Sequence, residues 1–262
     1  GMKVWKNRVL RGNLKFIGVD LAWGFRRPSP FCIIRKVNDG FRYEVTLYLT
    51  SLEDFASFFR DERSPLCLAI DAPLTVINQE GNRRAEREIA PFLRQFRGGI
   101  LPVNLSIVEQ RYPNLILFWK LLAKYHFQIA LPFVNSFQRI AFEVFPPLTV
   151  LGLWGGEVLA TYRKAKKGGG FSPPFLERLC DLESSHFPLP LVGLKQFLLS
   201  AQENPALFTD TLDALLCAYT ACYLWARGRE YACIFGTPEE GKVVMPLHDA
   251  QRALVNLANS RA

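Results

Sequence analysis

Five acidic residues stand where the sequence predicts that a strand ends or a helix begins, and they are the best candidates for chemistry. Asp20, Asp71 and Glu143 each close an apolar run, and Asp210 and Asp213 open a long segment rich in alanine and leucine. Carboxylates that gather in one place repel one another unless a cation neutralises them. Oxygen ligands favour Mg²⁺ or Mn²⁺ over zinc, and two such ions can activate water in phosphodiester cleavage. The pattern therefore predicts a divalent-metal centre.

Each of these acids also has an ordinary structural interpretation. Asp20 precedes a turn signal at residues 24–28, and Asp210 with Asp213 could cap a helix and complement its dipole. However, a charge at the end of a buried strand is costly unless something pairs with it. Because the strand-end acid recurs, and one aspartate would suffice as a cap, we favour a shared site.

The predicted strands explain how the acids could meet. Residues 16–20, 30–37 and 43–49 are predicted as an antiparallel meander, with an Asn-Asp-Gly turn at residues 38–40. Ser51 and Asp54 predict a capping box at the start of a helix. That helix forms a crossover to the apolar run 66–70, which is therefore predicted to lie parallel to the first strand. Ligands of open α/β sheets bind at the carboxyl edge that such strands share.

The remaining chain extends this α/β plan. Residues 138–147 are predicted as another strand that the prolines terminate, residues 209–228 as a long helix, and residues 231–235 and 242–246 as final strands. We predict one domain over residues 14–246 with a helical insertion at about 75–137. Residues 1–13 form a lead-in whose Gly1 is typical of a trimmed expression tag, and residues 247–262 form a tail.

Basic residues supply the candidate substrate contacts. Arginines cluster at residues 83–97, and residues 162–170 are predicted as a basic, glycine-rich surface loop that lacks the spacing of a Walker motif. The ordinary interpretation is a solvated helix face with paired charges. The functional interpretation is a basic surface that binds phosphates, because the arginine fork suits them. The predicted substrate contacts are Arg83, Arg87, Arg94, Arg97 and Lys164.

Composition narrows the function classes. The formal charge of +8 and pI near 9.3 favour polyanionic partners. Three scattered histidines argue against a zinc site or a histidine triad, and the six cysteines contain no C-x-x-C pair and predict a reducing compartment. No apolar run is long enough to span a bilayer. We therefore predict a soluble, cytoplasmic protein with no membrane partner, and the sequence leaves its oligomeric state open.

Five motifs resemble those of a widespread bacterial and archaeal family of unknown function, whose members are described as predicted ribonuclease-H-like nucleases. The motifs are IGVDLAW at 17–23, AIDAPL at 69–74, EVFP at 143–146, DTLDALLCAY at 210–219 and GTPEEG at 236–241. They are specific in combination, and the resemblance spans about residues 14–246. Where the family often has an acidic-basic pair after its second motif, this chain has Glu86 and Arg87.

The resemblance implies a ribonuclease-H-like fold, with a mixed five-stranded sheet of order 3-2-1-4-5, an antiparallel second strand and helices on both faces. It implies that Asp20, Asp71 and Asp213 bind metal and act in catalysis. The pattern of acids adds Asp210 as a further metal ligand and Glu143 as a further catalytic residue. The expected function is Mg²⁺- or Mn²⁺-dependent hydrolysis of DNA or RNA.

Two alternatives stay open at this point. One is a non-catalytic nucleic-acid-binding or scaffold protein that uses the basic surface. The other is an ATPase or phosphotransferase of the actin and hexokinase type, whose fold also places an aspartate at the end of its first strand. Such enzymes usually carry more glycine and hydroxyl residues after that aspartate than Leu21-Ala-Trp23 offers.

Overall fold

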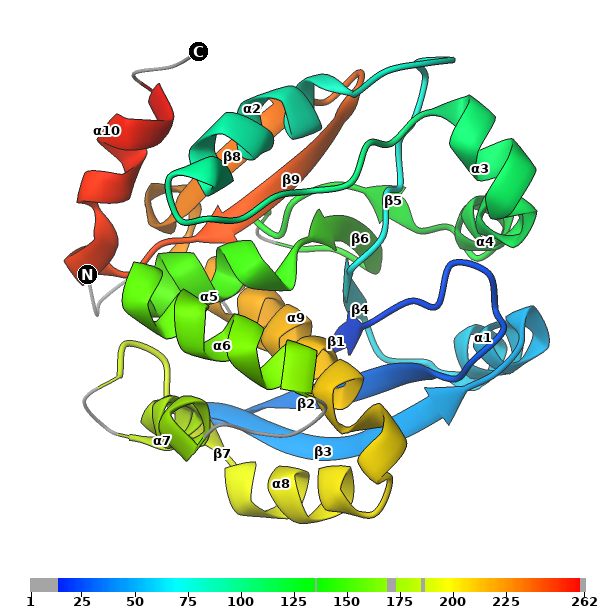
Figure 1. Ribbon diagram of the computed structural model, residues 1–262. Coiled ribbons are helices and arrows are strands. Elements are labelled where there is room, and N and C mark those ends of the chain that lie inside the picture. Colours follow the sequence, from blue (N-terminus) through cyan, green and yellow to red (C-terminus); the bar gives the residue numbers. More distant parts are fainter. Residues whose placement is uncertain (1–13, 135, 169–172, 185–186, 260–262) are drawn as a thin grey trace.

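One mixed sheet forms the frame of the protein (Figure 1). The computed structural model describes residues 14–134, 136–168, 173–184 and 187–259, so the predicted lead-in with Gly1 lies outside the described residues. Within these ranges the sheet has nine strands, of which eight follow the order β7-β3-β2-β1-β4-β6-β9-β8, while β5 pairs with β6. The strands are β1 (Lys15–Val19), β2 (Ser29–Val37), β3 (Gly40–Leu49), β4 (Leu66–Ile70), β5 (Gln128–Ile129), β6 (Arg139–Val144), β7 (Leu191–Val192), β8 (Ala232–Thr237) and β9 (Gly241–Pro246).

Strand directions follow the predicted meander and crossover. β2 is antiparallel to both β1 and β3, whereas β4 is parallel to β1 and to β6. The path β3-β2-β1-β4-β6 thus matches the predicted order, but the predicted total of five strands is wrong. β9 adds in parallel to β6, and β8 pairs antiparallel with β9. The short β7 extends the other edge.

Helices cover both faces of this sheet. Residues of α1 and α4 pack on the face that carries Ile17, whereas α9 packs on the face that carries Phe16. In Figure 1, α1, α3 and α4 lie together at the right, and α5 and α6 lie at the left with α9 beside them. The helices are α1 (Leu52–Asp61), α2 (Arg84–Arg94), α3 (Leu105–Arg111), α4 (Pro113–Lys124), α5 (Pro146–Trp154), α6 (Gly156–Gly168), α7 (Pro173–Cys180), α8 (Leu194–Gln202), α9 (Phe208–Arg227) and α10 (Ala253–Asn259). The capping box at Ser51 and Asp54 is confirmed at the start of α1.

Alternating side chains on the strands feed two hydrophobic cores. Phe16 of β1 enters the core that contains α9, whereas its neighbour Ile17 enters the core beneath α1 and α4. Helix α9 is buried along nearly its whole length, which fits its apolar, alanine-rich sequence. It ends at Gly228, whose φ of 84° suits a residue without Cβ.

Two segments differ from the prediction. Residues 162–168 were predicted as loop but belong to helix α6, because Leu159, Tyr162 and Ala165 recur every three residues and form a buried face. The predicted tail after residue 246 contains the helix α10, which packs Leu254 into the core. The predicted insertion holds α2, α3, α4 and β5. None of the helices in the described ranges has both the length and the apolarity that a membrane span needs.

Candidate metal centre

The register of the central strands places Asp20 beside Asp71. Val19 lies opposite Ile70 in the parallel pair of β1 and β4, so the next residue of each strand is an aspartate. The ladder continues one step past the strands, because the Asp71 amide donates to the Val19 carbonyl at 2.9 Å. Both carboxylates therefore leave the carboxyl edge of the sheet in one row, on the face that α9 covers.

Helix α9 reaches the same edge because β1 lets it approach closely. A Cβ on Gly18 would lie 1.9 Å from the Ala214 carbonyl oxygen and 2.2 Å from the Ala218 nitrogen, so the packing requires glycine. This approach places Asp213, which precedes Ala214, beside Asp20. Neither Asp210 nor Asp213 caps the helix, since α9 begins at Phe208 and its N-cap, Leu207, makes no side-chain cap hydrogen bond. Asp210 in the first turn is therefore available to the site.

Three of the predicted acids converge closely enough to share an ion. One carboxylate oxygen each from Asp20, Asp210 and Asp213 lies within 4.8 Å of the other two. Asp20 and Asp213 are buried, at 6% and 0% exposure, and Asp210 is partly exposed. Asp71 adjoins this group, because the strand register places it beside Asp20. Accordingly, the negative charges of Asp213 and Asp71 both raise the pKa of Asp20.

Helix α6 brings two further side chains to the cluster. The Tyr162 hydroxyl donates to Oδ1 of Asp213 at 2.7 Å, and Lys166, one turn later, donates to Oδ2 of the same carboxylate. Arg27, in the turn after β1, donates to Asp210. In contrast, the Asp20 carboxylate accepts no hydrogen bond among the described residues. A buried carboxylate without a hydrogen-bond donor is costly, and a cation bound at Asp20 would offset that cost.

Burial and mutual repulsion disfavour the charged forms of these acids. Burial raises the pKa of Asp20 well above its usual value, and Asp213 and Asp71 add to the rise. Burial and then the Asp213 charge raise the pKa of Asp71 to about 7. Burial also raises the pKa of Asp213, against the opposing effect of Lys166. Burial alone would lower the pKa of Lys166, but Asp213 outweighs it and the net shift is upward. The cluster thus favours protons or a cation.

Glu143 does not join this cluster. It lies opposite Ile70 in the pairing of β4 with β6, one residue before the row of Asp20 and Asp71. Side chains alternate along a strand, so the Glu143 carboxylate points to the other face. There it accepts two bonds from Arg83, each at 2.9 Å, from Nη1 and Nη2.

Glu86 completes an acid-arginine-acid triad. It accepts from Nε and Nη2 of Arg83, at distances down to 2.6 Å, and Nη1 also donates to the Thr75 carbonyl. Arg83 is 2% exposed and Glu86 1% exposed. Every guanidinium nitrogen of Arg83 is engaged, so this arginine has no donor left for a substrate, and Glu143 is already paired with a cation. Neither Arg83 nor Glu143 is therefore part of the proposed site.

The other predicted substrate contacts lie at the surface. Arg87 is on α2, where its guanidinium lies 3.8 Å from Glu240, and Arg94 and Arg97 are exposed at and beyond the end of that helix. Arg163 of α6 donates to the Phe96 carbonyl and so ties this segment to the helix that carries Lys166. Lys164 is exposed on α6.

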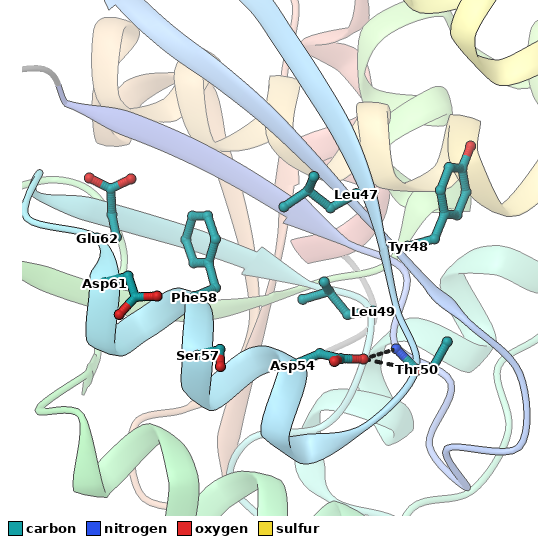
Figure 2. Close-up of a pocket in the computed structure, with 9 residues that line it drawn as sticks. All are labelled: Leu47, Tyr48, Leu49, Thr50, Asp54, Ser57, Phe58, Asp61 and Glu62. Atoms are coloured by element: carbon teal, nitrogen blue, oxygen red, sulfur yellow. Dashed lines mark hydrogen bonds between the residues drawn. The ribbon is translucent and has the colours of Figure 1, made fainter.

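A separate groove lies between β3 and α1 (Figure 2). Its floor is apolar, with Leu47, Leu49 and Phe58, and its acidic groups include Glu62, which pairs with Lys15 at 2.7 Å, and Asp54, which belongs to the capping box. None of the five candidate acids lines it. The groove therefore offers no support for catalysis.

Sequence reasoning missed Arg27, Tyr162 and Lys166. The lysine-rich stretch before Gly168-Gly-Gly170 suggested a loop, although Tyr162 and Lys166 have the i,i+4 spacing of one helix face. Arg27 was part of the predicted turn, and its pairing with Asp210 spans 183 positions of the chain. Only the helical periodicity of α6 could have been found in advance.

The donor set fits a hard divalent cation. Carboxylate oxygens are the ligands that Mg²⁺ and Mn²⁺ prefer, and Asp20 supplies one that is buried and has no donor. A family model described as "Protein of unknown function (DUF429)" matches residues 18–240, a range that includes all four aspartates. The chain belongs to this family. The description of DUF429 names no activity, so the ribonuclease-H-like description stays a prediction. No curated protein and no solved structure matches the chain.

Proposed function

We propose that this DUF429 chain is a metal-dependent nuclease that hydrolyses phosphodiester bonds of DNA or RNA. The observation that carries the proposal is the convergence of Asp20, Asp210 and Asp213 within 4.8 Å, with Asp20 buried and without a donor. Mg²⁺ or Mn²⁺, when bound, supplies a Lewis acid that polarises the phosphate and activates water. These three aspartates would hold the ion.

The chain's own groups suit the remaining parts of this chemistry. Asp71 lies beside Asp20 in the strand register, where its carboxylate can add a ligand or accept a proton from water. The exposed cations Arg87, Arg94, Arg97 and Lys164 suit a polyanionic substrate, as does the formal charge of +8. We also propose a ribonuclease-H-like core, supported by the path β3-β2-β1-β4-β6 with β2 antiparallel.

The test is cleavage of labelled single-stranded, duplex and branched DNA and RNA with Mn²⁺, with Mg²⁺ or with EDTA. We expect cleavage that requires the metal and that Asp20→Asn abolishes, while nucleic-acid affinity in EDTA stays within about threefold of wild type. The control is Asp61→Asn, at an exposed position of α1. If EDTA or Asp20→Asn leaves cleavage unchanged, the assignment is wrong.

Two further measurements, made beside the cleavage assay, separate the alternatives. Salt-sensitive binding without any cleavage would favour the binding-only protein. A rise in melting temperature with millimolar ATP, again without cleavage, would favour the ATPase.

A further inference from the structure

Two cationic side chains, those of Lys166 and Arg27, pair with members of the aspartate cluster. Lys166 donates to Asp213 and Arg27 donates to Asp210, from side chains that are 39% and 51% exposed. The charges of both cations also act on Asp20 and Asp71. When Asp20, Asp71, Asp210 and Asp213 are all ionised they carry four negative charges, and the two cations cancel two of them. One divalent cation balances the remaining charge of minus two, and a second would leave an excess of positive charge.

The hydrogen bonds of Asp213 also favour one bound ion over two. Both oxygens of Asp213 are engaged, Oδ1 by Tyr162 and Oδ2 by Lys166. Centres that hold two ions need those ions about 3.5 to 4 Å apart, with carboxylates shared between them. Each carboxylate oxygen keeps a second lone pair, so Asp213 can still bind the ion that Asp20 and Asp210 hold, but the Lys166 ammonium already occupies the position beside Oδ2. Tyr162 is 3% exposed, so α6 is anchored and keeps the lysine at the cluster.

Among the three converging aspartates, Asp210 and Asp213 each accept a hydrogen bond from a cation. Asp20 is 6% exposed, and its carboxylate accepts no hydrogen bond among the described residues. We propose that the site takes one divalent cation, held at Asp20, and that the Lys166 ammonium occupies the place of a second ion. This inference rests on the proposed metal function. Lys166 is then a positioning residue that sets the metal stoichiometry and orients Asp213.

The experiment counts bound Mn²⁺ at about pH 8 by isothermal titration calorimetry and native mass spectrometry, without any substrate. We expect one ion per wild-type chain and two per chain in Lys166→Met, which removes the ammonium but keeps most of the unbranched apolar stem. Lys166→Arg restores a positive charge and should bind one ion. The matched control is Lys167→Met, at the next, exposed position of α6, which should also bind one.

The outcomes are distinct. Two ions bound to the wild type would overturn this inference and leave the nuclease proposal standing. One ion in Lys166→Met, folded as judged by circular dichroism, would show that the lysine does not hold the second place, which also overturns it. No ion bound to the wild type would overturn the metal-dependent function itself. If Lys166→Met does not fold, the wild-type count still tests the stoichiometry, because one ion supports it and two ions overturn it.

Discussion

Two groups of acids lie near the ends of neighbouring parallel strands, and they differ in how fully their carboxylates are hydrogen-bonded. Glu143 and Glu86 share the guanidinium of Arg83, which is 2% exposed and bonded at every nitrogen. The four aspartates share Lys166 and Arg27, whose side chains are 39% and 51% exposed and which leave Asp20 without a donor. The first group is closed and the second is open toward a ligand.

The difference comes from one step of register. Glu143 lies in the row of Val19 and Ile70, and the aspartates lie in the next row, so the two groups face opposite sides of the sheet. On one side the start of α2 supplies an arginine, and on the other side α9 supplies more carboxylates. Similar side chains thus become a structural ion group or a candidate site according to the element opposite them.

Removing Arg83 should have the largest effect on this comparison. Arg83→Met leaves Glu86 and Glu143 buried without their cation, and we expect a loss of about 3 to 5 kcal/mol in the free energy of unfolding. Urea denaturation measures it, with Arg84→Met at a half-exposed position of α2 as the control that changes little. Arg83→Met combined with Glu143→Gln should recover part of the loss. A loss as small as that of the control would mean that the triad is not a closed group.

Gly18→Ala should have an intermediate effect, and it should act on the open cluster only. The new Cβ would clash with the backbone of α9 at Ala214 and Ala218, so we expect a loss of about 1 to 3 kcal/mol. The displaced helix would move Asp213 away from Asp20 and weaken Mn²⁺ binding in a calorimetric titration. Gly24→Ala is the control, because its Cβ would meet only ordinary contacts, with the nearest atom at 3.7 Å. Unchanged stability and metal affinity in Gly18→Ala would refute the close packing of α9 on β1.

The smallest expected effect is the pH dependence of the metal-free protein. The folded state raises the pKa of Asp71 from 3.8 to about 7, so it favours the protonated carboxyl group. That contribution to stability is complete below about pH 4 and is lost as the pH rises through about 7. In EDTA, Asp71→Asn should therefore gain at least about 1 kcal/mol relative to wild type between about pH 5 and pH 8. Urea denaturation over this range, with Asp61→Asn as control, checks it. Parallel curves for wild type and Asp71→Asn would mean that Asp71 is not buried beside another charge.

The sequence by itself determined the strands that carry the acids and the row in which two of them meet. The apolar runs before Asp20 and Asp71 and the crossover helix between them predict two parallel strands with aligned ends, which the structure has. These features are local, since hydrophobic periodicity, capping and proline stops are encoded within a few residues.

Tertiary structure alone decided which charges pair. Glu143 ends a strand in the same way as the aspartates, yet its register turns it to Arg83, and the arginine predicted to bind substrate became its buried partner. Lys166 and Arg27 meet Asp213 and Asp210 across 47 and 183 positions of the chain. Pairing over such distances depends on how α6 and α9 pack on the sheet, and no local pattern carries that information. The sequence therefore predicted where charges would gather, and only the packing decided which of them stay unpaired.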